Sequence, residues 1–262
     1  MSRRIYQVGN AEITRISDGV LARIRPQTLI PQWDSELQTI SLSMHAWLVR
    51  EEGHSILIGT AAGNPPFLMD LRDSGATPDE IDLVLLSHLY SDNIGWNTRC
   101  ENGRWIPTFP NAQYLFPHSE YAFFQDEANR TDGNRSHFLA QTDSMQPVIE
   151  AGLGKTLEAG LPVDGFSALP APGHSPAHTA FVLRSDNRIA LFCGSSLQHP
   201  IQVQNPEWNC ASDAFPQAAI ESRRRLLEFA ADHEASVFTS HFTDSSVGRI
   251  YRTASGFLWR FM

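Results

Sequence analysis

The spacing of apolar and polar positions predicts a chain of many short strands and few helices. Apolar residues alternate with polar ones over Arg4–Ile16, which is typical of a strand with one buried face. Leu83–Leu86 is apolar throughout, which is typical of a strand buried on both faces. Further strands are expected at Ser41–Val49, Ile56–Ile58, Gln113–Phe116, Phe166–Leu169, His178–Leu183, Ile189–Cys193 and, as the last of them, Ser236–Thr239.

Helical signals are fewer. Ala214–Ala231 is long and amphipathic, and Pro65–Ser74 predicts a short helix. Thr77 is placed to cap a helical turn, because Pro78 follows it and acidic residues come next. Leu21–Thr39 is irregular. The sequence contains no internal repeat or linker-like tract, so we expect one domain over residues 1–262, of α/β class, with packed sheets and outer helices.

Composition excludes several classes of protein. The 262 residues are 42% hydrophobic, enough for a sizeable core, but no apolar run is long enough to span a membrane. The net charge of −9 argues against a nucleic-acid partner. Lys155, the single lysine, lies in a polar stretch interpreted as a surface turn, which disfavours Schiff-base chemistry. The start of the sequence lacks the apolar stretch of a secretory signal, and three widely spaced cysteines form no disulfide framework, so a cytoplasmic location is expected.

The segment Ser87-His88-Leu89-Tyr90-Ser91-Asp92-Asn93-Ile94-Gly95 carries the strongest functional signal. It resembles the H-x-H-x-D-H metal-binding loop of the metallo-β-lactamase-fold hydrolases. Its first His and its Asp match, as His88 and Asp92, but Tyr90 and Asn93 stand where two further His ligands are expected. A phenol is an uncommon ligand for zinc or iron and a carboxamide a weak one.

The resemblance extends along nearly the whole chain, from Ile13–Gly19 to Ser240-His241-Phe242. Ala171–His178 is similar to the family's G-H-T-P-G-H motif, so His174 would be a ligand and His178 structural. His241 matches the last ligand His. Gly95–Arg99 and Gly103–Ala112 look like a subgroup of lactonase-like hydrolases. The resemblance implies an αββα sandwich with its active site at one edge, between two sheets.

Two more departures accompany those in the loop. Ser195 stands where the family has an Asp that bridges two metals, and Gly59 stands where an Asp supports the ligand loop. We therefore expect no bound metal. If one zinc, iron or manganese ion is retained, its ligands would be His88, Asp92, His174 and His241 together, although the loss of the supporting Asp argues against this.

Without a metal, the same positions still offer acid–base chemistry. His174 and His241 titrate near neutral pH and are the first candidates for base and acid. Tyr90 is a candidate proton donor or substrate anchor, Asp92 would orient and charge a neighbouring His, and His88 is a further candidate catalytic residue. Ser195 is interpreted as a small polar residue that fills space, because its context is no G-x-S-x-G turn; it would be a nucleophile only with a His within hydrogen-bonding reach.

The expected substrate is a small, partly apolar molecule. Trp33, Trp96, Trp105 and Trp208 all lie in segments interpreted as loops, and such loops cover the active site in the family. Asn93, Ser195, Trp33, Trp96 and Trp208 are the candidate substrate-binding residues.

Three functions remain open. The first is a metal-independent enzyme that acts by hydrolysis, elimination or cyclisation on a small carbonyl, ester or lactone. The second is a lactonase-like hydrolase that keeps one rearranged metal ion. The third is a catalytically dead binding or regulatory protein. We rank them in that order, and the retained His88, Asp92, His174 and His241 favour an enzyme over a dead fold. The sequence leaves the oligomeric state open.

Overall fold

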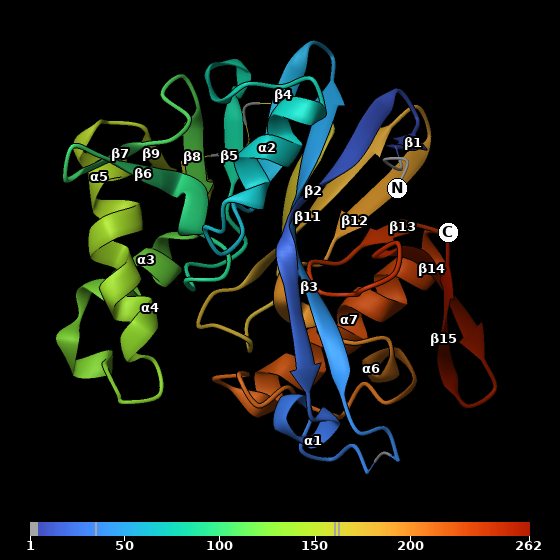
Figure 1. Cartoon of the computed structure of the whole chain (residues 1–262). Helices are drawn as coiled ribbons and strands as arrows, with labels where there is room; N and C mark the ends of the chain where they lie inside the picture. Colours follow the sequence, from blue (N-terminus) through green and yellow to red (C-terminus); the bar gives the residue numbers. More distant parts are fainter. Residues whose placement is uncertain (1–4, 35, 160, 162) are drawn as a thin grey trace. The chain divides into compact units, whose positions relative to one another are not determined.

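A computed structural model describes residues 5–34, 36–159, 161 and 163–262 (Figure 1). The chain divides into two units: residues 1–19 with 45–162, and residues 20–44 with 163–262. Strands β2 (Ala11–Ile24) and β3 (Ile40–Glu51) contribute residues to both units. Whether residues 1–262 behave as one domain stays a prediction.

A seven-stranded sheet with the order β1-β2-β3-β4-β5-β8-β9 forms the framework of the first unit. Strands β4, β5, β8 and β9 are mutually parallel along this order. All three residues of β5 are buried, as expected of a parallel strand covered on both faces. The remaining strands of this sheet are β1 (Ile5–Val8), β4 (His54–Ile58), β5 (Leu83–Leu85), β8 (Gln113–Phe116) and β9 (Gly154–Thr156).

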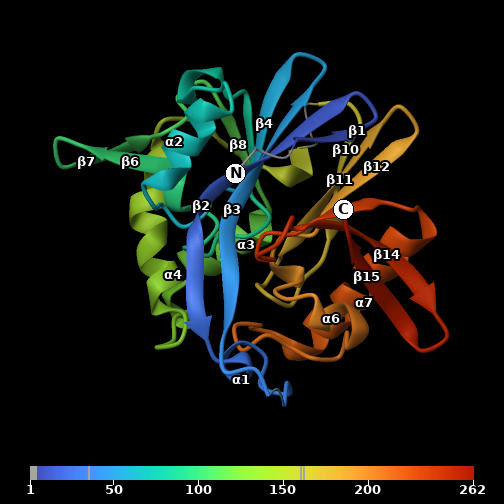
Figure 2. The same ribbon diagram turned by 45° about the vertical axis from the view of Figure 1, so that its right-hand side comes forward.

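Helices pack against this sheet through apolar side chains. Phe67 and Leu71 of α2 are fully buried in the same cluster as Leu57 and Val84 of the sheet. Figures 1 and 2 show α2 beside β4 and β5, and Figure 2 shows the separate hairpin of β6 (Thr98–Glu101) and β7 (Arg104–Pro107). The helical elements of this unit are α2 (Pro66–Asp73), α3 (His118–Gln125), α4 (Arg135–Ala140), α5 (Gln146–Glu150), the 3₁₀ turns η1 (Pro78–Glu80), η2 (Gly95–Asn97), η3 (Glu127–Asn129) and η5 (Leu157–Ala159), and the π-helical turn η4 (Gln141–Met145).

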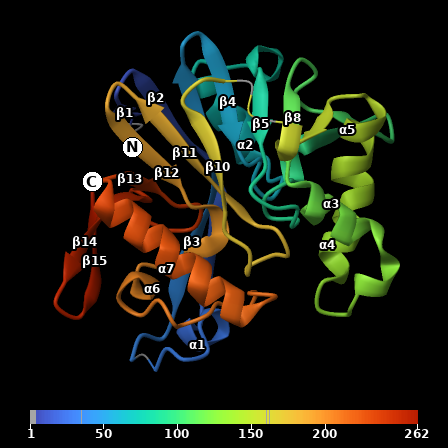
Figure 3. The ribbon, with the colours of Figure 1, turned by 180° about the vertical axis from the view of Figure 1, so that it is seen from behind.

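The second unit contains a six-stranded sheet with the order β10-β11-β12-β13-β14-β15. Helix α7 buries Ala219, Arg223, Leu226 and Ala230, a spacing of three to four residues that places them on one face (Figure 3). Leu226 packs in one cluster with Val182 of the sheet. The elements of this unit are β10 (Phe166–Pro170), β11 (Thr179–Ser185), β12 (Arg188–Phe192), β13 (Ser236–Phe238), β14 (Val247–Thr253), β15 (Gly256–Phe261), α1 (Pro26–Leu29), α6 (Ile201–Gln204), α7 (Pro216–Asp232) and the 3₁₀ turn η6 (Gly194–Ser196).

Several predictions about these elements were wrong. Arg4 lies outside the described residues, and the rest of the expected strand 4–16 is a hairpin of β1 and β2 joined at Gly9, which has a φ of +60°. Strands β14 and β15, which follow the expected strand Ser236–Thr239, were not predicted. Lys155 belongs to strand β9 rather than to a turn. Within the described part of the chain, no helix is long and apolar enough to cross a membrane.

Candidate functional site

The loop after β5 holds four of the predicted site residues on one short segment. His88 is buried, and its Nδ1 lies 2.9 Å from Ser87 Oγ. Its other ring nitrogen, Nε2, lies 3.8 Å from Asp92 Oδ1. Asp92 is the carboxylate near this imidazole, and its role of orienting a neighbouring His stays a prediction. Tyr90 lies between these two residues in the sequence, and its ring makes an edge contact with the His88 ring at 5.3 Å; Asn93 follows Asp92.

Asn93 occupies the space above Gly59. Its amide Nδ2 donates to the His88 carbonyl at 2.8 Å, and the Asn93 carbonyl accepts from Thr60 N at 2.9 Å. A Cβ atom on Gly59 would lie 2.5 Å from Asn93 Oδ1, and Gly59 has a φ of +75°. The Asn93 side chain therefore fills the volume into which a larger residue at position 59 would project. The glycine at position 59 and the asparagine at position 93 therefore depend on each other, because the side chain of one occupies the space left by the other.

The turn that follows Gly59 is fixed by a buried carboxylate. Asp18 accepts from the backbone of Ala62 at 3.0 Å and from the backbone of Asn64 at 2.8 Å. Burial raises the pKa of Asp18. The indole of Trp96 donates to the Asn64 carbonyl at 2.9 Å and stacks near Phe67, so Trp96 contributes to holding this turn.

Tyr90 is stacked on an imidazole that the sequence motifs do not mark. The rings of Tyr90 and His137 are 3.9 Å apart and nearly parallel, with an interplanar angle of 4°. His137 Nδ1 accepts from Ser91 N at 3.2 Å, and the buried carboxylate of Glu120 accepts from Leu89 N at 3.2 Å. Helices α3 and α4 thus hold the loop that carries Tyr90.

In the second unit, His174 is oriented by a buried carboxylate. His174 Nδ1 lies 3.1 Å from Asp213 Oδ1. The other oxygen, Asp213 Oδ2, accepts from Arg223 Nη2 at 3.0 Å and from Cys210 N at 2.9 Å. Arg223 also donates to the Ser196 carbonyl at 3.1 Å. Burial lowers the pKa of Arg223, and the Asp213 carboxylate opposes that shift.

Ser195 and His241 form a hydrogen-bonded pair in the same unit. Ser195 Oγ lies 2.9 Å from His241 Nε2, and both side chains are almost completely buried. Ser195 N donates to His178 Nε2 at 3.1 Å, and the His178 ring lies 6.0 Å from the His174 ring. His174, His178, Ser195 and His241 therefore form one contiguous group. His178 has the structural role expected of it.

The aromatic candidates lie in two places. Trp33 and Trp208 belong to one apolar cluster of the second unit, and Trp33 packs against the His199 ring at 4.6 Å. Burial lowers the pKa of His199 to about 4, so this imidazole is neutral near pH 7. Trp96 lies in the first unit, in the turn η2. Trp105 belongs to strand β7, so its placement in a loop was wrong.

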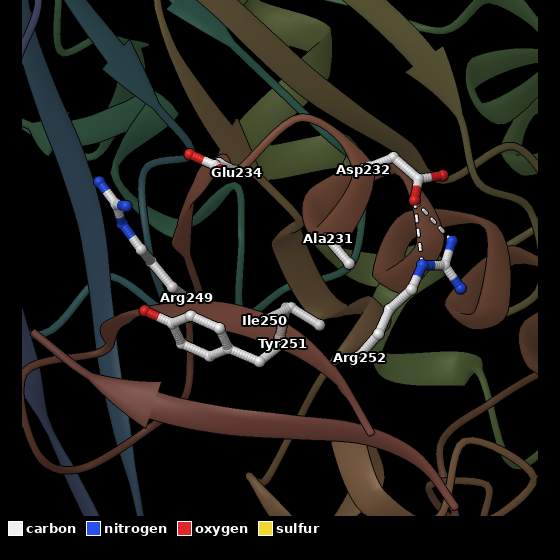
Figure 4. Close-up of a pocket in the computed structure, with 7 residues that line it drawn as sticks. All are labelled: Ala231, Asp232, Glu234, Arg249, Ile250, Tyr251 and Arg252. Atoms are coloured by element: carbon white, nitrogen blue, oxygen red, sulfur yellow. Dashed lines mark hydrogen bonds and ion pairs between the residues drawn. The ribbon is translucent and has the colours of Figure 1, made fainter. Parts of the chain in front are cut away.

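A pocket of about 320 Å³ lies in the second unit, at the junction of α7 and β14 (Figure 4). Asp232 and Arg252 form a 2.7 Å ion pair at its edge, and Arg249 and Tyr251 line it. None of the predicted site residues lines this pocket. The predicted site residues therefore lie outside this pocket.

The residues do not fit the two-metal centre of the motif. Among the residues that the structure describes, no three His, Cys, Asp or Glu side chains form a group that could hold an ion. Asn93 uses its amide on the His88 carbonyl, Tyr90 is stacked on His137, and the Ser195 hydroxyl bonds to His241. We derive no chemical step through a metal from this arrangement.

Four contributors were missed by sequence reasoning. Asp213 and Arg223 lie 39 and 49 residues after His174 and match no motif, and Glu120 and His137 lie in helices that were not predicted. The signal for Arg223 was its place on the buried face of an amphipathic helix, where an arginine needs a carboxylate partner.

Residues 43–241 match the model of the metallo-beta-lactamase superfamily. The chain belongs to this superfamily. Its α/β fold of the metallo-β-lactamase type was predicted correctly.

The named proteins to which this chain is similar share less than a quarter of its residues in the aligned regions. It is 24% identical over 179 residues to the N-acyl homoserine lactonase AttM of Agrobacterium fabrum (strain C58 / ATCC 33970), which covers 67% of this chain and 63% of AttM. The crystal structure of the hydrolase AbOPH superimposes with a TM-score of 0.87 at 23% identity, over 99% of this chain and 97% of that one. The dizinc quorum-quenching lactonase AidC gives 0.85 at 22% identity, with the same shares.

Proposed function

We propose that this protein is an enzyme that uses acid–base chemistry, without a bound metal, on a small ester, lactone or related carbonyl compound. The supporting observation is the 3.1 Å contact between His174 Nδ1 and Asp213 Oδ1. A proton on Nδ1, held by the carboxylate, puts the lone pair of the neutral ring on Nε2. That nitrogen then exchanges a proton with a substrate.

The proposed roles follow from these contacts. His174 and His241 are the base and acid, Tyr90 is a proton donor or substrate anchor, and Asp92 orients His88. The candidate substrate-binding residues stay those given by the sequence: Asn93, Ser195, Trp33, Trp96 and Trp208.

Metal independence rests on the residues that stand at ligand positions. A carboxamide, a phenol and a hydroxyl are poor ligands for zinc and iron, and each of these side chains has a hydrogen-bonding or stacking partner within its own unit. The expected partner is a small molecule and not a nucleic acid, since the net charge is −9. A cytoplasmic location is proposed from the cysteine pattern alone.

Elemental analysis of chelator-free protein, followed by ester and lactone hydrolysis assays with and without EDTA, tests this proposal. We expect less than about a tenth of an ion per chain and a rate that EDTA leaves unchanged. His174→Ala should lower the rate by about 10²–10⁴-fold if it acts as acid or base. His54→Ala, which alters an exposed imidazole on β4, is the matched control and should keep full rate. A rate abolished by EDTA would refute metal independence.

A lactonase that keeps one metal ion is the second candidate. It is favoured by the likeness to AttM and by the 3.8 Å approach of His88 Nε2 to Asp92 Oδ1, which is the spacing of two groups near a common ion. Stoichiometric zinc, iron or manganese that survives dialysis would establish it. A catalytically dead protein would hydrolyse none of the esters and lactones in either assay.

A further inference from the structure

We infer that Ser195 is the nucleophile of the reaction and that His241 is its general base, so that catalysis passes through an acyl-serine intermediate. This inference rests on the proposed function for its substrate class. It also separates the two imidazoles, since it assigns proton transfer to His241 and leaves His174 to donate a hydrogen bond to the intermediate. Sequence reasoning favoured a space-filling role for Ser195 unless a His lay within reach, and that condition is met.

The backbone at Ser195 is held from both sides. It lies in η6, the 3₁₀ turn that follows β12. Ser195 N donates to His178 Nε2 at 3.1 Å, and its carbonyl accepts from Gln198 Nε2 at 3.2 Å. With both backbone groups fixed, the hydroxyl has a defined direction, and it lies 2.9 Å from His241 Nε2. This distance is within the range over which a base takes a proton directly.

The backbone at His241 is also held in place. His241 follows β13, and its carbonyl accepts from Ser43 N at 2.8 Å. The next residue, Phe242, is buried against the Trp259 ring at 5.1 Å. A proton on Nδ1 of His241 leaves Nε2 as the acceptor for the serine hydroxyl. Because both side chains are shielded from bulk water, the hydrogen bond between them is stronger than it would be on the surface.

The chemical step balances without a co-reactant other than water. Ser195 Oγ forms a bond to the substrate carbonyl carbon while its proton passes to His241 Nε2. The tetrahedral intermediate breaks the bond to the leaving oxygen, which takes the proton from His241 and departs as an alcohol, or stays attached if the substrate is a lactone. Water, deprotonated by His241, then attacks the acyl-serine; the bond to Ser195 Oγ breaks, the carboxylic acid is released, and His241 returns the proton to Ser195 Oγ.

The negative oxygen of the intermediate needs a side-chain donor. The two nearest backbone amides are already used, since Ser195 N donates to His178 and Ser196 N donates to the Cys193 carbonyl. We assign that donor to His174, in the same contiguous group: once its Nε2 has taken a proton, it donates to this oxygen while Nδ1 stays 3.1 Å from Asp213 Oδ1. Asp213 is thus a positioning residue.

The adjacent serine provides a matched control. Ser196 Oγ lies 3.3 Å from His178 Nδ1, so it is also a buried serine beside an imidazole, but that imidazole is committed to the backbone of Ser195. If any buried serine in this turn reacted, Ser196 would react as well. Ser196→Ala should therefore leave both labelling and turnover unchanged.

Labelling with phenylmethanesulfonyl fluoride, read by intact mass and peptide mapping, is the decisive experiment. We expect one sulfonyl group on Ser195 in the parent chain and in Ser196→Ala, none in Ser195→Ala, and labelling at least about 10²-fold slower in His241→Ala. Absence of label from Ser195 in the folded parent chain would overturn the inference, and that result needs no variant. So would a Ser195→Ala variant that hydrolyses a substrate at the parent rate.

The same measurements separate this inference from the proposed function. Sulfonylation requires no turnover, so label on Ser195 in a chain that hydrolyses no ester or lactone upholds the serine–histidine pair and refutes the proposed function. Hydrolysis that is insensitive to EDTA and unaffected by Ser195→Ala upholds the proposed function and refutes the pair. A chain whose hydrolysis and labelling are both lost in Ser195→Ala supports both.

Discussion

Replacement of Gly59 by alanine should destabilise the protein beyond the strain of its backbone. Gly59 has a φ of +75°, a region that costs an alanine about 1–2 kcal/mol. The new Cβ would also lie 2.5 Å from Asn93 Oδ1, so the amide must rotate away. That rotation breaks its 2.8 Å bond to the His88 carbonyl and leaves buried polar groups unsatisfied, at about 1–3 kcal/mol. The sum is about 2–5 kcal/mol.

Urea denaturation separates the cost of backbone strain from the cost of displacing the Asn93 amide, provided the m-value is constant. Three comparisons are needed: Gly59→Ala and Gly152→Ala, each against the parent chain, and Gly59→Ala in an Asn93→Ala background. Gly152→Ala is the control, because Gly152 has a φ of +72° and nothing within 4 Å of an added Cβ; it should cost about 1–2 kcal/mol. In an Asn93→Ala background, Gly59→Ala should fall to the same cost, which gives a coupling of about 1–3 kcal/mol. Equal costs of Gly59→Ala in both backgrounds would refute the claim that Asn93 fills this space.

Three further results are expected. The combined variant Tyr90→His, Asn93→His and Ser195→Asp should bind zinc in equilibrium dialysis, with affinity about 10–100-fold below that of a site with its supporting carboxylate, and a folded variant without zinc would show that the loop has diverged. Burial gives His199 a pKa of about 4 in the folded protein against 6.5 in the unfolded chain, so the unfolded chain binds more protons between these two pH values. The free energy of unfolding should therefore fall by about 3 kcal/mol from pH 6.5 to pH 4. In His199→Phe, the denaturation midpoint should depend less on pH over this window. Arg223→Met should cost about 3–5 kcal/mol in chemical denaturation, because the Asp213 charge stays buried without its partner, and a cost below 1 kcal/mol would contradict that account.

The sequence predicted best those elements whose burial pattern is uniform. Gln113–Phe116 was predicted with its observed bounds, and the all-apolar strand at Leu83 within one residue. The hairpin of β14 and β15 was missed because its faces are mixed: Arg260 packs over the Tyr251 ring at 5.1 Å, and such cation–π pairs stabilise a strand whose sequence looks polar.

The helices of the first unit were missed for a different reason. Glu120 is completely buried within α3, where a carboxylate at a core position conceals the helical pattern. The π-helical turn Gln141–Met145 then shifts the helical period between α4 and α5, so apolar positions on its two sides do not follow one repeat.

The sequence motifs indicated candidate site residues but not the residues that hydrogen-bond to them. His174, Ser195 and His241 do lie together, and His88 does approach Asp92. Partners such as Asp213 depend on how distant segments pack, which no local spacing encodes. The role of Asn93 was also out of reach, because it depends on the empty space above a glycine 34 residues earlier.

Because Asn93 fills the space beside Gly59, the two positions limit which substitutions the protein tolerates. A single codon change that returns an aspartate to position 59 meets the amide of Asn93, and one that places a histidine at position 93 removes the bond to the His88 carbonyl. Each route towards the two-metal pattern therefore passes through a destabilised intermediate before any ion is gained. The two positions are therefore coupled, so that a change at one of them carries a stability cost until the other changes as well.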